Sequence, residues 1–176
     1  MKLGYLLWEK EKTQLEYYQA EDKRSDVAVL IFPGGGYVGH TAHEGQGYAE
    51  MFNSWGISAF VLNYRVTPDY FPKPLLDARR AIRFIRANAE KFGVDKRKIL
   101  VIGSSAGGHL AALLSTYTQP IAGESNDFID RESYMPNAQI LCYPVISSDE
   151  DFGHIPSYQN LLGIVYLKKK DLIQSC

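Results

Sequence analysis

A serine flanked by glycines, placed between a short apolar run and a helix-like segment, constrains this chain more than any other feature. The apolar run covers residues 98–102, Gly103-Ser104-Ser105-Ala106-Gly107 follows it, and a helix is expected over 108–117. A G-x-S-x-G motif between a strand and a helix requires a sharp turn that holds the middle residue in a strained backbone conformation. Glycine on either side leaves room for the strand and the helix to pass closely. The sequence therefore predicts that Ser105 presents an exposed hydroxyl at the end of a strand.

The alternation of apolar runs and helical segments predicts an α/β fold with a mostly parallel sheet flanked by helices. Continuous apolar runs are typical of strands that are buried on both faces. One helix is expected over 44–54 and a longer one over 75–92, where apolar residues recur every three or four positions. Arg79, Arg80 and Arg83 are expected mostly on the opposite face of the longer helix. The runs that we interpret as strands lie at 26–32, 57–63, 98–102 and 138–143.

The composition limits the class of protein. A chain of 176 residues suffices for one domain, and 45% hydrophobic with 22% charged residues is typical of globular proteins. The formal net charge of −1, from 19 basic and 20 acidic residues, gives no reason to expect nucleic acid or an anionic membrane as a partner. No apolar stretch reaches the ~18 residues of a membrane span, and the apolar part of the N-terminus is too short for a signal peptide.

The two cysteines, Cys142 and Cys176, form neither a disulfide framework nor a metal-ligand pattern. Cys142 lies inside an apolar run and is expected to pack in the core. We therefore expect a cytoplasmic protein without a metal site, folded as one domain over residues 1–176.

The chemistry of a serine nucleophile requires a base for its proton and N–H donors for the oxyanion. The N–H of Ala106 and the stretch Gly34-Gly35-Gly36, which follows the first buried strand, match the two sources of such donors in α/β hydrolases. Three glycines also occur in turns and phosphate loops, but Tyr37-Val38 stands where a P-loop has Gly-Lys-Ser/Thr. A dinucleotide site is disfavoured because Asn63-Tyr64-Arg65 provides no acidic residue after the next strand.

The chain resembles the α/β-hydrolase family of small esterases and lipases, near its acetyl-esterase and xylan-esterase-like branch. Pro33 replaces the histidine of the commoner H-G-G-G form, as in that branch. The resemblance spans most of residues 15–170 and implies hydrolysis of carboxylic esters of small acyl groups, often acetylated sugars. It implies Ser105 as nucleophile, with Gly35, Gly36 and Ala106 as oxyanion donors, and no metal or organic cofactor. The segments that carry the resemblance are 32–37, 43–45, 62–66, 77–81 and 103–110.

The acid and the histidine of a triad are harder to find after Ser105, although this fold places both after the nucleophile. His109 lies one helical turn further on, and we interpret it as packing or hydrogen-bonding support. Asp149 and His154 remain as a candidate acid and base. They lie close together in sequence, and the strand expected between them is missing, so the assignment stays open.

The resemblance implies two further strands that carry the acid and the histidine in family members. The segment 168–172 looks like a helix cut short before them, so we expect a C-terminally truncated hydrolase with impaired activity. Strand 138–143 would then be an exposed apolar edge, and we expect self-association through it. The other expected partner is a small-molecule ester, with no nucleic acid and no membrane. The alternatives are a catalytically inactive hydrolase-fold fragment or binding module, and a serine peptidase of the same fold.

Overall fold

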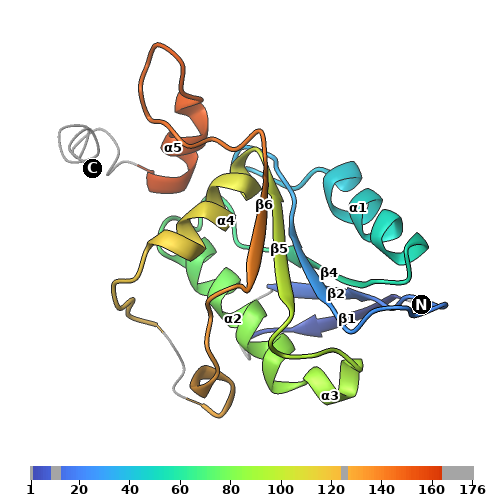
Figure 1. Cartoon of the computed structure of the whole chain (residues 1–176). Helices are drawn as coiled ribbons and strands as arrows, with labels where there is room; N and C mark the ends of the chain where they lie inside the picture. Colours follow the sequence, from blue (N-terminus) through green and yellow to red (C-terminus); the bar gives the residue numbers. More distant parts are fainter. Residues whose placement is uncertain (1, 9–12, 124–126, 164–176) are drawn as a thin grey trace.

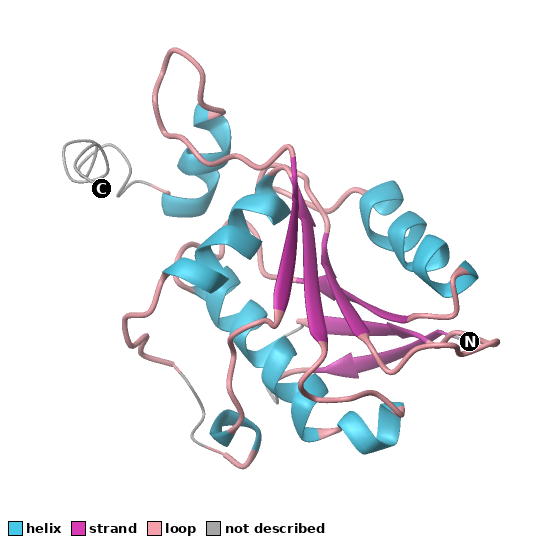
Figure 2. Cartoon of the chain, in the orientation of Figure 1, coloured by secondary structure: helices cyan, strands magenta, loops and turns pink. Residues whose placement is uncertain are grey.

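The computed structural model describes residues 2–8, 13–123 and 127–163, and these ranges form one mixed sheet with helices on both faces (Figures 1 and 2). The strand order is β1-β2-β4-β3-β5-β6. The strands are β1 (Lys2–Leu6), β2 (Gln14–Tyr18), β3 (Ala28–Phe32), β4 (Ser58–Asn63), β5 (Ile99–Ser104) and β6 (Ala138–Cys142). The helices are α1 (Ala42–Ser54), α2 (Lys73–Ala87), α3 (Ala89–Phe92), α4 (Ala106–Thr116) and α5 (Ile155–Leu162), and Ile129–Arg131 forms a turn of 3-10 helix.

The parallel part of the sheet is the part that the apolar runs predict. Strands β4, β3, β5 and β6 pair in parallel, and every residue of β3 is buried. Strands β1 and β2 were not predicted; they pair antiparallel with each other, and β2 pairs antiparallel with β4. The predicted α/β architecture is confirmed, with these two strands as an addition to it.

Alternation along β3 builds two apolar cores, one on each face of the sheet. Val29 and Ile31 pack toward the face covered by α1, in a cluster with Phe52. Leu30 and Phe32 belong to the larger cluster on the other face, which is covered by α2 and α4 (Figure 1). Full burial of each large aliphatic or aromatic side chain contributes about 1.5–3 kcal/mol, so β3 is held from both sides.

The arginines of α2, expected mostly on the face opposite the apolar one, are themselves buried. Their guanidinium groups contact the loop between α4 and β6. Arg79 donates to the carbonyl oxygens of Tyr117 and Gln119 at 2.7 and 3.1 Å, and Arg80 pairs with Asp127 at 2.6 Å. The loop carbonyls and carboxylates supply acceptors that compensate for the burial of these charges. The buried arginines are Arg79, Arg80, Arg83 and Arg86.

The expected helix over 75–92 is divided at Asn88. Helix α2 ends at Ala87, and α3 covers only Ala89–Phe92 before Gly93 ends it in a left-handed conformation with φ of 63°. The apolar spacing continues through the break, so periodicity alone does not reveal it.

Strand β6 is one edge of the sheet formed by the described residues, and its side chains are poorly covered. Ile140 is 43% exposed and Leu141 is 37% exposed. Cys142 is half-buried and packs against the apolar cluster on the α1 face, so it lies at the edge of the core instead of inside it. Cys176 and the segment 168–172 lie outside the described residues. In the ranges that are described, no helix has the length and apolarity needed to span a bilayer.

Candidate active site

Ser105 occupies a strained turn between β5 and α4. Its backbone has φ of 51° and ψ of −118°, a region that residues with a side chain rarely adopt and that costs of order 1–3 kcal/mol. The neighbouring glycines are required by packing, because a Cβ at Gly107 would clash with the carbonyl oxygen of Phe32, and a Cβ at Gly103 would clash with that of Gly107. The geometry is that of the predicted strand–turn–helix, and the Ser105 side chain borders an open cleft.

Backbone hydrogen bonds fix this turn to the segment that follows β6. The N–H of Ser105 donates to the carbonyl oxygen of Cys142 at 3.0 Å, and the N–H of Val145 donates to the carbonyl oxygen of Ser105 at 3.1 Å. A Cβ at Gly108 would approach Cβ of Pro144 to 2.9 Å, which shows how closely α4 passes that segment. The position of Ser105 therefore depends on β6 as well as on β5.

The triple-glycine segment lies directly beside Ser105. A Cβ added at Gly34 would lie 3.1 Å from Cβ of Ser105, and Gly35 and Gly36 have φ of 136° and 62°. The N–H of Gly34 is engaged by Glu44 at 2.7 Å. No acceptor within the described ranges takes the N–H groups of Gly35, Gly36 or Ala106. N–H groups without a protein acceptor are the kind of donor that an oxyanion needs.

The cleft beside Ser105 has a volume of about 530 Å³. It is lined by Ser105 and by residues 143–147 and 152–154. Phe152 is 77% exposed there, and Tyr143 at the end of β6 is also exposed. The lining contains no carboxylate and no lysine or arginine, so the cleft suits an uncharged ligand.

The structure brings His154 to the same cleft as Ser105 but does not join Asp149 to it. Nδ1 of His154 lies 2.8 Å from Oγ of Ser157, and the Asp149 carboxylate accepts the N–H of Asp151 at 2.9 Å. No hydrogen bond between Asp149 and His154 occurs in the described part of the chain. A triad requires the acid to orient the imidazole, and this pairing is not formed.

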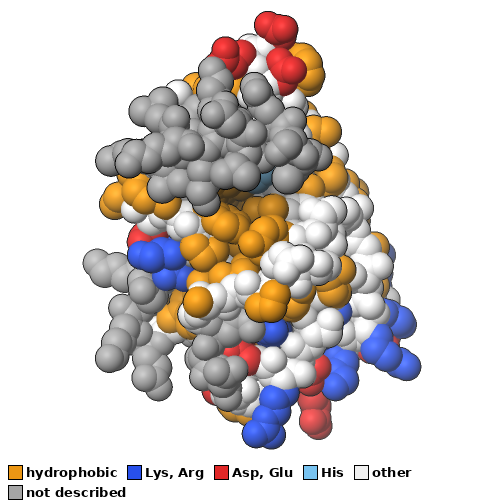
Figure 3. Space-filling model, turned by 90° about the vertical axis from the view of Figure 1, so that its left-hand side faces the viewer, with side chains coloured by type: hydrophobic (Ala, Val, Ile, Leu, Met, Phe, Trp, Pro, Cys, Tyr) orange, Lys and Arg blue, Asp and Glu red, His pale blue; other side chains and the backbone are white. Residues whose placement is uncertain are grey.

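His109 has a partner away from the serine. Its Nδ1 lies 2.7 Å from the hydroxyl of Tyr37, and burial lowers its pKa to about 4. The ring also lines an apolar cavity of about 160 Å³ between α4 and α5. Figure 3 looks onto this side of the molecule, where hydrophobic side chains gather. The contacts are those of packing and hydrogen-bonding support.

Two residues at the site, Glu44 and Tyr143, were missed by sequence reasoning. Glu44 is only 4% exposed, and its carboxylate accepts hydrogen bonds from the N–H of Gly34 and the hydroxyl of Tyr143. Glu44 lies in the segment 43–45 that carried the family resemblance, but a glutamate at the start of a helix is ordinarily exposed. Only the fold brings it behind the glycine loop.

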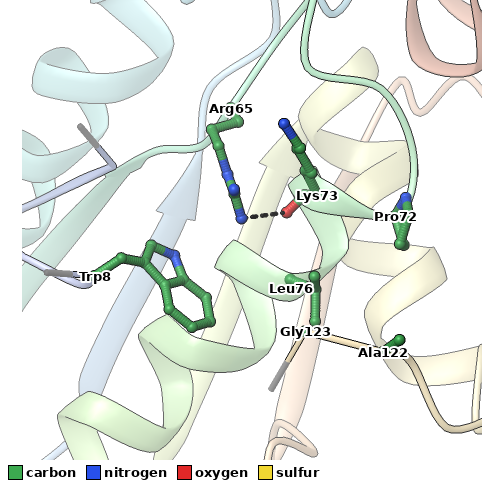
Figure 4. Close-up of a pocket in the computed structure, with 7 residues that line it drawn as sticks. All are labelled: Trp8, Arg65, Pro72, Lys73, Leu76, Ala122 and Gly123. Atoms are coloured by element: carbon green, nitrogen blue, oxygen red, sulfur yellow. Dashed lines mark hydrogen bonds between the residues drawn. The ribbon is translucent and has the colours of Figure 1, made fainter. Parts of the chain in front are cut away.

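A second pocket, of about 370 Å³, is lined by Trp8, Arg65, Lys73 and neighbouring residues (Figure 4). The Arg65 side chain extends between Trp8 and Lys73 in that view and donates to the Lys73 carbonyl oxygen at 3.5 Å. Arg65 also pairs at 2.8 Å with the fully buried Asp77, which accepts the Trp8 indole N–H at 2.7 Å. These groups satisfy one another, which indicates a structural network.

Within the described ranges, no group of three or more potential metal ligands is assembled.

Sequence comparison relates the chain to esterases and xylan-degrading proteins. The BD-FAE family model matches residues 15–149. The acetylxylan esterase of Xylanibacter ruminicola is 33% identical over 163 residues, which cover 92% of this chain and 31% of that protein. Endo-1,4-beta-xylanase B of Butyrivibrio fibrisolvens is 36% identical over 151 residues, which cover 84% of this chain and 23% of that protein. The chain thus spans less than a third of either relative.

A solved structure has the same fold. The acetyl ester-xyloside bifunctional hydrolase from Caldicellulosiruptor lactoaceticus matches with a TM-score of 0.82 and 39% sequence identity, over 94% of this chain and 66% of that one. The parallel pairing of β4, β3, β5 and β6 and the turn at Ser105 agree with the fold that the sequence predicts. The family match covers well over half of the chain, and together these findings show that it belongs to the BD-FAE family and has the esterase-like α/β-hydrolase fold.

Proposed function

We propose that this chain carries the nucleophile and the oxyanion hole of a serine hydrolase for small carboxylic esters. The observation that carries the proposal is the juxtaposition of the strained Ser105 with the glycine loop, at the edge of an open cleft. Oγ of Ser105 attacks the acyl carbonyl carbon, and the N–H groups of Gly35, Gly36 and Ala106 receive the oxyanion. The tetrahedral intermediate expels the alcohol and leaves an acyl-enzyme, which water hydrolyses.

The proposed substrates are acetyl esters of neutral sugars. The related protein from Xylanibacter ruminicola is named an acetylxylan esterase, and the matching solved structure is named an acetyl ester-xyloside hydrolase. The cleft is consistent with such substrates because its lining has no carboxylate, lysine or arginine. Exposed Tyr143 and Phe152 offer aromatic faces on which a sugar ring could rest.

The proton of Ser105 needs an acceptor, and the cleft offers one candidate base. His154 shares the cleft with Ser105, and Asp149 remains its candidate acid, although the two are not hydrogen-bonded. We therefore propose a low rate of turnover for this chain by itself. Oxyanion stabilisation and binding alone retain about 10³–10⁴-fold catalysis over water in serine hydrolases that lack a triad member.

The second candidate is a catalytically inactive hydrolase-fold module that binds a ligand or another chain. The observation that favours it is that Asp149 and His154, both in the described ranges, make hydrogen bonds to other residues and none to each other. In an inactive module, Ser105 would not react with an electrophilic probe. In an esterase, the probe would covalently modify Ser105.

The two candidates are separated by covalent labelling. The chain is incubated with a fluorophosphonate probe and, separately, with p-nitrophenyl acetate. We expect stoichiometric labelling at Ser105 and measurable release of p-nitrophenol, both lost in Ser105→Ala. Ser115→Ala is the matched control, because Ser115 lies on α4 but its hydroxyl bonds Ala111 and Gln139 instead of facing the cleft. Absence of labelling in the wild-type chain would leave only the inactive module.

We also propose that two copies associate through β6. This edge has exposed apolar side chains and unpaired backbone groups in the sheet of the described residues, and such an edge favours pairing with another strand.

A further inference from the structure

A buried carboxylate lies behind the glycine loop and has no role in the chemistry proposed above. Glu44 is in the first turn of α1, and its side chain is enclosed between that helix, the loop that follows β3 and the end of β6. Burial of an ionised carboxylate is costly unless hydrogen bonds compensate for the lost water. The partners of Glu44 therefore indicate what it does.

Three donors converge on the carboxylate. The N–H of Gly34 donates to Oε2 at 2.7 Å, and the Thr41 hydroxyl donates to the same oxygen. The Tyr143 hydroxyl donates to Oε1. Gly34 and Tyr143 lie 109 positions apart in the numbering, on the two backbone segments that flank Ser105. One side chain thus connects both walls of the candidate site.

Gly34 is wedged between Glu44 and the serine turn. A Cβ at this position would meet Oε2 of Glu44 at 2.6 Å, the carbonyl oxygen of Ser104 at 2.9 Å and Cβ of Ser105 at 3.1 Å. The carbonyl oxygen of Gly34 accepts the N–H of Thr41 at 3.0 Å. Both ends of the Gly34 residue are therefore held, and with them the peptide group that carries the Gly35 N–H. The next peptide group, which carries the Gly36 N–H, is held through the Gly35 carbonyl oxygen, which accepts the N–H of Val38 at 3.0 Å.

The charge of Glu44 strengthens these contacts. Burial alone would raise its pKa, but hydrogen bonds from Thr41, Tyr143 and the Gly34 N–H outweigh burial and hold the pKa below its ordinary value. The carboxylate is ionised at neutral pH and lies at the positive end of α1. Hydrogen bonds to an ionised acceptor are about twice as strong as those between neutral groups.

We propose that Glu44 is a positioning residue, which clamps Gly34 and Tyr143 so that the N–H groups of Gly35 and Gly36 face the oxyanion formed at Ser105. Glu44 touches neither the substrate nor the reacting atoms. The inference rests on the proposed ester hydrolysis for its kinetic consequence. The clamp itself is a property of the folded chain.

The test compares Glu44→Ala, Glu44→Gln and Tyr143→Phe in the full chain. The side-chain amide introduced by Glu44→Gln can still accept the Gly34 N–H through its oxygen and donate to the Tyr143 oxygen through its nitrogen. We expect Glu44→Ala to lower kcat for p-nitrophenyl acetate about 100-fold, as expected for a 1 Å misplacement of a catalytic group. Tyr143→Phe removes one donor and is expected to lower kcat about 10-fold, since bonds to charged groups are worth that order. Glu44→Gln is expected to lower kcat by less than about 10-fold, clearly less than Glu44→Ala, because its hydrogen bonds persist but lose the strength that an ionised acceptor gives.

Two readouts separate positioning from loss of folded protein. KM is expected to stay unchanged, because the oxyanion donors act in the transition state, and titration with the fluorophosphonate probe counts the active molecules. The amide proton of Gly34, assigned by NMR, is expected far downfield in wild type and Glu44→Gln, and upfield in Glu44→Ala. Glu50→Gln is the control, since Glu50 is an exposed carboxylate on the same helix that bonds Gln46, away from the glycine loop.

Failure of the positioning role of Glu44 can be distinguished from failure of the proposed ester hydrolysis. Wild-type kcat in Glu44→Ala, an equal loss in Glu44→Ala and Glu44→Gln, or an unchanged Gly34 amide proton would overturn the positioning role. If the wild-type chain neither binds the probe nor hydrolyses ester, the proposed hydrolysis fails. The Gly34 resonance, which needs no activity, then decides alone whether Glu44 holds the loop.

Discussion

The hydroxyl of Tyr37 lies 2.7 Å from Nδ1 of His109, one helical turn beyond Ser105. This contact ties the residue that follows the triple glycine to the helix that follows the serine. Tyr37 is almost fully buried, and its backbone has φ of 61°, so the side chain that reaches His109 comes from a constrained loop. The hydrogen bond engages one nitrogen of the imidazole and aligns the glycine loop with α4.

The stability of the fold is expected to fall in mild acid because of His109. Burial lowers its pKa in the folded state to about 4, whereas an unfolded histidine has a pKa of about 6.5. Between these values the unfolded chain binds a proton that the folded chain excludes, so stability is complete above pH ~6.5 and declines as the pH falls toward ~4. The expected loss from pH 7.5 to pH 5 is about 2 kcal/mol from this residue.

Urea unfolding at the two pH values tests this expectation with His109→Gln as the comparison. The glutamine variant has no titrating group at this position, so its free energy of unfolding is expected to change less between the two pH values. The same dependence in both proteins would show that His109 does not titrate as inferred.

Gly107 is expected to tolerate no side chain. Gly107→Ala places a methyl group against the carbonyl oxygens of Phe32 and Pro33, which are backbone atoms that cannot move away easily. The expected destabilisation is about 2–4 kcal/mol, the upper range for overpacking. Gly4→Ala is the control, because no atom lies within 4 Å of a Cβ at that position. Thermal or urea unfolding of both variants gives the comparison, and equal stability of the two would contradict the packing argument.

The local motifs can be recognised from the sequence alone, because their signal lies in neighbouring residues. The strand, the turn at Ser105 and the triple glycine are each encoded within a few positions. The same holds for β3 and β5, whose continuous apolar runs are characteristic of buried parallel strands.

The features that sequence reasoning missed depend on contacts between distant positions. Strand β2 has the sequence QLEYY, with polar residues inside, and pairing with β4 defines it as a strand. Arg79 can be buried because two carbonyl oxygens accept its hydrogen bonds. These acceptors lie 38 and 40 positions away in the sequence, so no local pattern reveals them. Glu44 and Tyr143 are 99 positions apart, and no periodicity connects them. Pattern reasoning identifies elements and turns, whereas these partnerships exist only in the folded chain.

Loss of Asp77 is expected to destabilise the protein strongly. Its carboxylate is fully buried and accepts hydrogen bonds from Arg65 and from the Trp8 indole. Burial raises the pKa of Asp77 by more than its hydrogen bonds and the charge of Arg65 lower it, so the intact pair contributes little net stability. Asp77→Ala nevertheless leaves the Arg65 charge largely buried without this acceptor, which costs about 3–5 kcal/mol.

Chemical denaturation of Asp77→Ala and of Asp22→Ala measures this difference. Asp22 pairs with Arg24 on the surface, where both side chains are mostly exposed, and such pairs contribute little. We expect a large decrease in the unfolding midpoint for Asp77→Ala and almost none for Asp22→Ala. Similar decreases in the unfolding midpoint of both variants would mean that burial of the Arg65–Asp77 pair does not increase the cost of losing the carboxylate.

The β6 edge is expected to mediate self-association that a single charge disrupts. Ile140 is 43% exposed on this strand, and an exposed apolar edge favours pairing with a second copy, whereas an edge lysine opposes it. Sedimentation velocity at micromolar concentration is expected to show dimers or larger species for wild type and a monomer for Ile140→Lys. Met51→Lys, a charge placed on α1 at a residue of 37% exposure, is expected to sediment like wild type. Because Ile140 is already in contact with solvent, its replacement does not remove a core side chain, and the change in sedimentation reports on the edge. A wild-type chain that sediments as a sharp monomer would show that β6 does not pair in solution.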